Sequence, residues 1–145
     1  MAEMIDYYQS ASEVRKEWSR TIDTVMRERP VFIQRTRDNL IMLDLATFRL
    51  LFEHVRFNVS VYTEKDGSVT CTEDDLDLAE NAASREDCIR QLITAMRDYA
   101  EDFYQDFFLW SKAPNRRAHI PYILKILAST DAEILEDIIC RDGKN

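Results

Sequence analysis

The spacing of apolar residues along the chain predicts a mixed α+β protein in which helical and extended segments alternate. Near the N-terminus four apolar residues recur at intervals of four, four and three: Val14, Trp18, Ile22 and Val25. This period is typical of an amphipathic helix. Ser10 is placed to cap it, with Glu13 three residues on in a capping-box arrangement. The helix should end before Pro30, because the residue before a proline avoids helical angles.

Short β-rich runs flank this helix. Met4–Tyr8 predicts an edge strand, while 31–36 and 40–43 predict a hairpin whose turn, Arg37–Asn39, tolerates left-handed angles. Asp44 can then cap a second helix with apolar residues spaced by three and four: Leu45, Phe48, Leu51, Phe52 and Val55. The first part of the chain therefore predicts the order β-α-β-β-α.

From Phe57 the period changes to two, which predicts strands. Asp66-Gly67 between two alternating runs is a strong hairpin signal. The acidic stretch that follows is either a third strand through Leu76 and Leu78 or a solvated connection, and the pattern slightly favours the strand.

The last third of the chain predicts helices. Ser84 can cap the longest one, whose core stripe is Ile89, Leu92, Ile93, Met96, Tyr99, Ala100, Phe103 and Phe107. Pro114 ends or restarts it, and Pro121 begins a short apolar helix. A final helix capped by Ser129 or Thr130 would carry four apolar residues, before a frayed tail from Arg141: Ile134, Leu135, Ile138 and Ile139.

Composition narrows the class of protein. With 145 residues and 46% apolar content, the chain can form one ordinary domain or two small ones. Two glycines and three prolines exclude a phosphate-binding P-loop or a dinucleotide-binding fingerprint. No apolar run approaches the ~20 residues that cross a bilayer, and the first residues lack signal-peptide features. We therefore expect a cytoplasmic protein with no membrane partner and no cofactor.

Candidate catalytic and metal-binding groups are weak. The three cysteines, Cys71, Cys88 and Cys140, form no Cys-x-x-Cys pair and predict reduced thiols in or near a core rather than a metal site or disulfide. The acidic run 73–77 lacks the glycine and spacing of a calcium loop and predicts surface charge.

A metal-dependent nuclease would need one cleft holding His119, Asp102 and Asp106. We favour simpler interpretations: His119 is a polar residue at a helix cap, and Asp102 and Asp106 lie on a solvent-exposed acidic face of a helix. The sequence therefore predicts no catalytic residue, no metal site and no enzyme.

Charge separates the two parts of the chain, whose net charge is −8. Residues 1–57 hold nine acidic and nine basic side chains, eight of the latter arginine, whereas residues 58–145 hold eighteen acidic and ten basic ones. An acidic body repels nucleic acid, yet the neutral first part could present a local basic face. The alternative is that its arginines only solvate a surface.

The first part resembles the N-terminal domain of Phd/YefM-type antitoxins over about residues 4–56. The motifs are Ser10-x-x-Glu-Val-Arg15 opening a helix, Pro30 followed by three apolar residues, x and Arg35, and the segment Leu43–Phe48. The turn 36–39 departs from the family because it lacks the usual glycine. The resemblance implies that residues 1–57 form a homodimer with a shared sheet, which binds operator DNA as a repressor.

The resemblance also implies where the DNA binds. Arg15 and Arg35 match arginines that contact DNA in that family, and Ser10 and Ser12 lie beside helix-start amides that favour phosphate. Lys16 and Arg37 are secondary candidates in the same neighbourhood. Without DNA contacts, Arg15 would pair with a carboxylate such as Glu13 or Glu17, and Arg35 would stack over a sheet edge.

Residues 58–145 are expected to form a second domain, a β-hairpin or three strands followed by mostly helical segments. The segments 57–62, 66–71, 75–78 and 84–89 resemble the strand–strand–strand–helix pattern of HicB-like antitoxin domains. Three aromatic residues that lie off the core stripe predict a surface that binds a cognate protein toxin: Tyr104, Phe108 and Trp110. The alternative is an interaction protein whose first domain dimerises without binding DNA.

Overall fold

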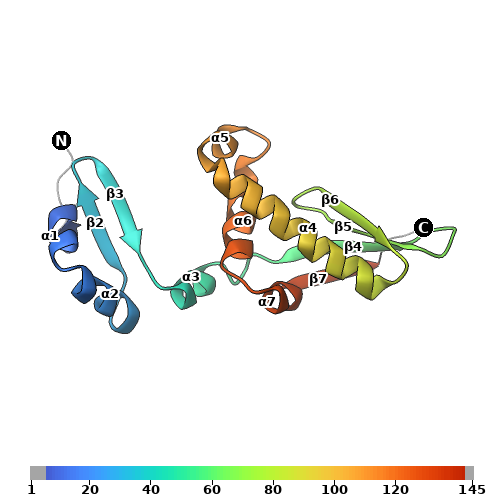
Figure 1. Ribbon diagram of the computed structural model, residues 1–145, viewed down its shortest axis with the longest axis horizontal. Helices are drawn as coiled ribbons and strands as arrows, with labels where there is room; N and C mark the ends of the chain where they lie inside the picture. Colours follow the sequence, from blue (N-terminus) through green and yellow to red (C-terminus); the bar gives the residue numbers. More distant parts are fainter. Residues whose placement is uncertain (1–5, 143–145) are drawn as a thin grey trace. The chain divides into compact units, whose positions relative to one another are not determined.

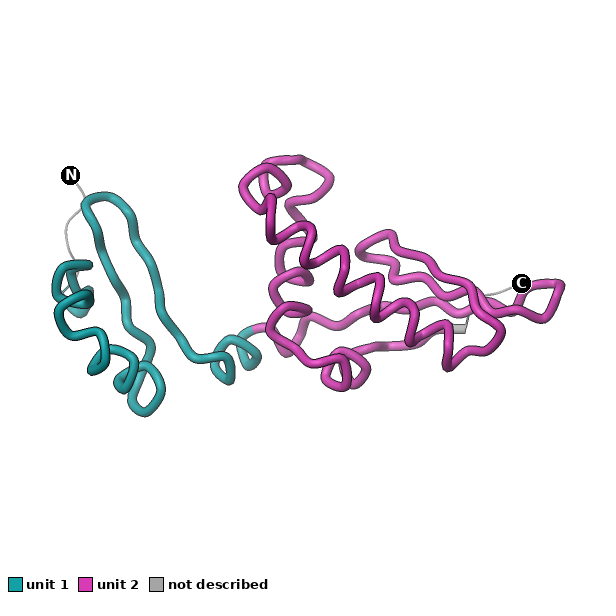
Figure 2. Tube along the Cα trace, viewed as in Figure 1, with its two compact units in different colours: residues 1–51 teal, residues 52–145 magenta. Residues whose placement is uncertain are grey.

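The computed structural model describes residues 6–142, which form an α+β protein of two compact units. Unit 1 comprises residues 1–51 and unit 2 residues 52–145 (Figure 2). The units divide before Phe52, whereas the sequence places the domain boundary after residue 57. The segment 52–57 is therefore structurally part of unit 2.

Unit 1 contains a three-stranded sheet in the order β1-β2-β3. β1 (Gln9–Ser10) pairs in parallel with β2 (Val31–Arg35), and β3 (Asp38–Met42) pairs with β2 in the antiparallel direction. Of the strand expected over residues 4–8, Met4 and Ile5 lie outside the described residues, and residues 6–8 belong to no strand. The strand begins later and leads directly into a helix.

The hairpin turn of unit 1 is tighter than predicted. Arg35 pairs with Asp38, so only Thr36 and Arg37 join the strands, and Asp38 and Asn39 belong to β3 rather than to the turn. Thr36 takes the left-handed conformation, with a φ of 54°. This is the position at which a glycine would be free of strain, since β-branched residues avoid positive φ.

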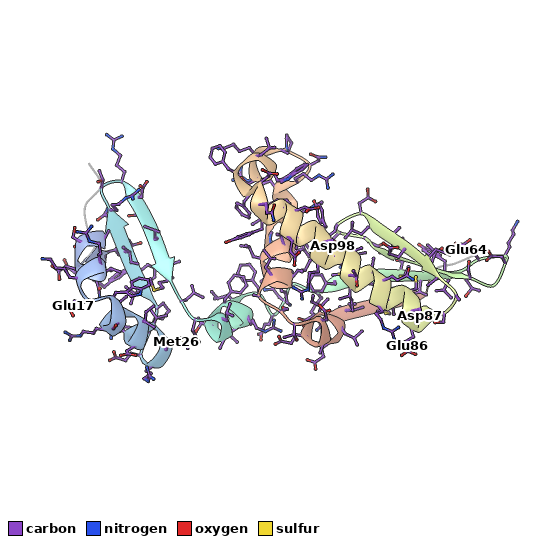
Figure 3. All side chains as sticks on the ribbon, viewed as in Figure 1. Glu17, Met26, Glu64, Glu86, Asp87 and Asp98 are labelled. Carbon is purple, nitrogen blue, oxygen red and sulfur yellow. The ribbon has the colours of Figure 1, made fainter. Side chains whose placement is uncertain are left out.

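The first helix is broken where the sequence predicts a continuous one. It consists of α1 (Ala11–Lys16) and α2 (Trp18–Arg27), which meet at Glu17, labelled in Figure 3. The break shifts the buried face, so Thr21 is buried with Val25 while Trp18 and Ile22 are 53% and 37% exposed. The expected apolar stripe is therefore only half correct. A short helix, α3 (Leu45–Leu51), ends unit 1.

Unit 2 contains a four-stranded sheet in the order β6-β5-β4-β7. β4 (Phe57–Thr63) and β5 (Val69–Glu73) form the predicted hairpin, with Gly67 at a φ of 86°, and β6 (Leu78–Ala82) is the third strand. The expected last helix is wrong beyond Glu136: Ile138 and Ile139 lie in β7 (Ile138–Asp142), which pairs in parallel with β4. Arg141 lies in this strand and not in a frayed tail.

The described part of unit 2 also has five helical segments: α4 (Arg85–Gln105), α5 (Phe107–Lys112), the 3-10 helix η1 (Arg117–His119), α6 (Ile120–Leu127) and α7 (Asp131–Glu136). Ser84 caps α4, whose first turn carries the acidic Glu86 and Asp87 labelled in Figure 3. Thr130 and Glu133 form a capping box on α7.

The core of unit 2 lies between its sheet and helices α4 and α6. α4 runs across one face of the strands and contacts β5, β6 and α6 (Figure 1). Its predicted stripe is confirmed as far as Phe103, since Leu92, Met96 and Phe103 are buried in the core. Phe107 belongs to α5, because the expected single helix breaks at Asp106. Unit 1 has a much smaller core: Val14, Val25, Val31 and Ile33.

Candidate nucleic-acid and partner interfaces

Helix α1 and its N-cap carry four of the predicted DNA-binding residues: Ser10 caps the helix, Ser12 lies in its first turn, and Arg15 and Lys16 lie in its last turn. The Ser10 hydroxyl accepts a hydrogen bond from the Glu13 amide at 3.2 Å, as a helix cap does, while Ser12, Arg15 and Lys16 are exposed. Among residues 6–142, Arg15 shows neither of the ion pairs considered for it.

Arg35 and Arg37 lie at the β2–β3 turn, and both are exposed. Arg35 forms an ion pair with Asp38, with 3.0 Å between Nη2 and Oδ2, instead of stacking over the sheet edge. Such exposed pairs contribute about 0–1 kcal/mol, so a phosphate can replace the carboxylate. Arg35 also borders a shallow groove lined by Ala11 and Val14 of α1, which brings the turn close to the start of that helix.

Unit 1 exposes apolar residues that the sequence analysis assigned to a core or did not single out. Trp18, Ile22 and Met26 follow each other at intervals of four along α2, and Met26 is labelled in Figure 3. Leu40 and Ile41 are exposed on β3, an edge strand. In the sequence, the interval of four between Trp18, Ile22 and Met26 was the signal that could have indicated a shared apolar face on this helix. Exposed apolar surface of this kind is typical of a protein interface.

Two of the three predicted partner-binding residues are exposed, and the third packs inward. Tyr104 and Phe108 are 62% and 76% exposed, next to the equally exposed Leu109. Trp110 is half-buried, with its ring centroid 6.4 Å from that of Phe103 and the Arg116 guanidinium 5.5 Å from its own. We define the apolar ridge as Tyr104, Phe108 and Leu109.

His119 belongs to a packed polar network. Its Nδ1 lies 2.7 Å from the Tyr99 hydroxyl, to which Arg116 donates at 2.8 Å. Burial and the nearby Arg116 charge lower the pKa of His119. Asp102 and Asp106 are exposed, and the described part of the chain contains no group of three or more histidine, cysteine or acidic side chains arranged to hold a metal ion.

The acidic run 73–77 is partly structural, which corrects its assignment to the surface. Glu73 is fully buried, and its Oε1 accepts hydrogen bonds from the amides of Asp75 at 2.7 Å and Leu76 at 3.0 Å. Asp74 accepts from Ser60, and Asp75 from Asn58. These contacts tie the β5–β6 turn to β4. Burial raises the pKa of Glu73 to about 7.

A second buried charge holds the beginning of unit 2. Lys125 of α6 is 2% exposed, and its Nζ donates to the carbonyls of Phe52 and Val55. The same Nζ lies 3.5 Å from Oδ2 of Asp137, just before β7. Lys125 thus joins three segments that are far apart in the sequence.

Comparison with known proteins places the molecule among antitoxins, which are non-enzymatic regulatory proteins. Residues 4–140 match the PHD-like family, described as the antitoxin of RelE/RelB-type toxin–antitoxin systems, and the chain belongs to this family. The specific Phd/YefM subgroup is a finer assignment than this match supports. The search of curated proteins finds no match.

A solved structure has the same fold. It is the antitoxin part of a proposed toxin/antitoxin system from Syntrophomonas wolfei, with 32% sequence identity and a TM-score of 0.86. The similarity covers 92% of this chain and 97% of the other, so it includes both units. None of the described helices is long and apolar enough to span a membrane.

Proposed function

We propose that this antitoxin acts as a homodimer that represses its own operon by binding operator DNA through unit 1, and that unit 2 binds and neutralises a protein toxin. The observation that best supports the proposal is the division of labour between the units. Unit 1 combines exposed arginines with exposed apolar residues on a small core, while unit 2 is acidic, well packed and carries the apolar ridge.

A homodimer is consistent with the properties of unit 1. Among residues 6–51 the buried core consists of four apolar side chains, which is marginal, so association would add stability that the isolated unit lacks. The exposed edge strand β3 and the α2 residues Trp18, Ile22 and Met26 supply apolar surface for a second copy. Pairing two units also doubles the number of arginines offered to one duplex.

The operator-binding part predicts a salt-dependent affinity that depends on Arg15 and Arg35. Replacing both residues by alanine should weaken binding to the upstream DNA at least tenfold and reduce the slope of log K against log salt by about 2 per protomer, because each phosphate contact releases about one counterion. Fluorescence anisotropy across a salt series measures both quantities. Arg27→Ala is the matched control, since Arg27 is exposed and paired with Asp23 on α2.

An unchanged affinity and slope in the double variant would refute the assignment of these arginines. If the unaltered protein does not shift upstream DNA at all, the alternative holds in which unit 1 only dimerises. The acidic unit 2 favours that alternative, because its charge opposes the approach of a duplex.

The toxin-binding part predicts that the apolar ridge carries the affinity for the toxin. Phe108→Ser should weaken toxin binding tenfold or more, because exposed aromatic anchors dominate protein interfaces. Calorimetric titration with the toxin encoded beside this chain measures the effect. Leu135→Ser is the control, since Leu135 is a similarly exposed apolar residue on α7. Equal losses for both substitutions would place the toxin elsewhere.

A further inference from the structure

Two buried cysteines of unit 2 are in contact. Cys71 lies in β5 and Cys88 in the first turn of α4, seventeen residues apart in the sequence. Both side chains are completely enclosed, and their sulfur atoms are 2.7 Å apart. The third cysteine, Cys140 of β7, is exposed. The fold thus brings together one pair of thiols from two different elements.

The neighbouring sheet carbonyls hold the pair of cysteines in place. Cys88 Sγ lies 3.2 Å from the Val69 carbonyl and 3.3 Å from the Glu80 carbonyl, so the sheet fixes its position. The described residues contain no group of three or more histidine, cysteine or acidic side chains that could hold a metal ion. A shift of less than about 1 Å would bring the two sulfur atoms to the ~2.05 Å of a covalent bond.

We propose that Cys71 and Cys88 are a modification site at which a hydroperoxide forms an intramolecular disulfide that joins β5 to α4. One thiolate attacks a peroxide oxygen, which breaks the O–O bond, gives a sulfenic acid and releases water or an alcohol. The second thiol then displaces that hydroxyl as water and forms the S–S bond. Two thiols are oxidised, and one hydroperoxide is reduced by the same two electrons.

The environment makes this reaction slow and pH-dependent. Burial and the neighbouring Cys88 raise the pKa of Cys71, so its thiol stays protonated at neutral pH. Only the thiolate is nucleophilic, and an enclosed sulfur meets peroxide only when the structure opens transiently. Once formed, the disulfide closes a loop from β5 to α4 and restricts the unfolded chain, which raises resistance to unfolding.

The test oxidises the intact chain. Reduced protein is incubated with hydrogen peroxide at several pH values, unfolded in the presence of N-ethylmaleimide, and analysed by intact mass and non-reduced peptide mapping. We expect the Cys71 and Cys88 peptides to be linked with the loss of two hydrogens and to carry no maleimide, while the exposed Cys140 carries either a maleimide or added oxygen from the peroxide. Reduction should restore maleimide adducts on both Cys71 and Cys88. The oxidised protein should have a higher urea midpoint than the reduced protein.

Two variants separate this pair from the exposed cysteine. Cys140→Ser should still lose two hydrogens on oxidation and then carry no maleimide, whereas Cys88→Ser should form no intramolecular disulfide. Because Cys88→Ser removes a core side chain, the Cys140→Ser protein provides the decisive result if that variant fails to fold. Maleimide adducts on both Cys71 and Cys88 after oxidation, or a disulfide that includes Cys140, would overturn the proposal.

Discussion

Lys125→Met is expected to destabilise unit 2 by about 3–5 kcal/mol. Methionine keeps the apolar stem but removes the ammonium, which leaves the carbonyls of Phe52 and Val55 without their buried donor and removes a charge partner of Asp137. Breaking one side of a buried ionic network is costly because the remaining polar groups stay desolvated. Urea unfolding followed by circular dichroism measures the loss.

The matched control is Lys65→Met, since Lys65 is an exposed lysine at the tip of the β4–β5 hairpin. Its substitution should change the free energy of unfolding by less than about 0.5 kcal/mol. A similarly small change for Lys125→Met would mean that the segment 52–56 is not held by the buried ammonium.

Glu73→Gln is expected to change the free energy of unfolding in a pH-dependent way. The change should be about 3 kcal/mol more stabilising above pH 7 than below pH 4.5. The folded protein holds the Glu73 pKa at about 7, above the 4.5 of an ordinary glutamate, because burial disfavours the charged form. As the pH rises between these values, the unfolded chain loses its proton first. The glutamate's contribution to stability is therefore complete below pH 4.5 and is lost as the pH rises to about 7.

Glutamine suits the site because its amide oxygen can accept the two hydrogen bonds from the Asp75 and Leu76 amides. Oε2 of Glu73 has no hydrogen-bond partner among the described residues, so replacing this oxygen by the amide nitrogen of glutamine breaks no hydrogen bond. Urea unfolding of both proteins from pH 4 to pH 8 measures the difference. The control, Glu64→Gln at an exposed position labelled in Figure 3, should give a difference that does not follow this window. A constant difference for Glu73→Gln would show that Glu73 titrates normally.

The structure also explains which sequence predictions were accurate. The α4 stripe as far as Phe103 and the Ser10 and Ser84 caps were correct, and of the two caps offered for the last helix Thr130 is the one formed, because both signals depend only on neighbouring residues. Ile138 and Ile139 were misassigned because their spacing from Ile134 and Leu135 suits a helix, while the partner that makes them a strand, β4, lies some eighty residues earlier. A parallel pairing of this kind leaves no local signal.

The candidate sites divide in the same way. The exposure of Arg15, Arg35 and Phe108 follows from their positions off the apolar stripes, and the structure agrees. Trp110 packs inward instead, because α5 begins a new helix after Asp106 and turns this ring towards Phe103. Trp18 turns outward for the corresponding reason, the break at Glu17.

The sequence alone determined the α+β class, the order of most helices and strands and the acidic second part, because periodicity, capping and charge are properties of neighbouring residues. The resemblance to antitoxins came separately, from short motifs shared with a known family. Only the tertiary structure decided that Lys125 and Glu73 are buried, that Cys71 meets Cys88, and that β7 completes the second sheet. Burial and contact depend on which distant segments pack together. A charged residue therefore looks the same in the sequence whether it faces water or holds a core together.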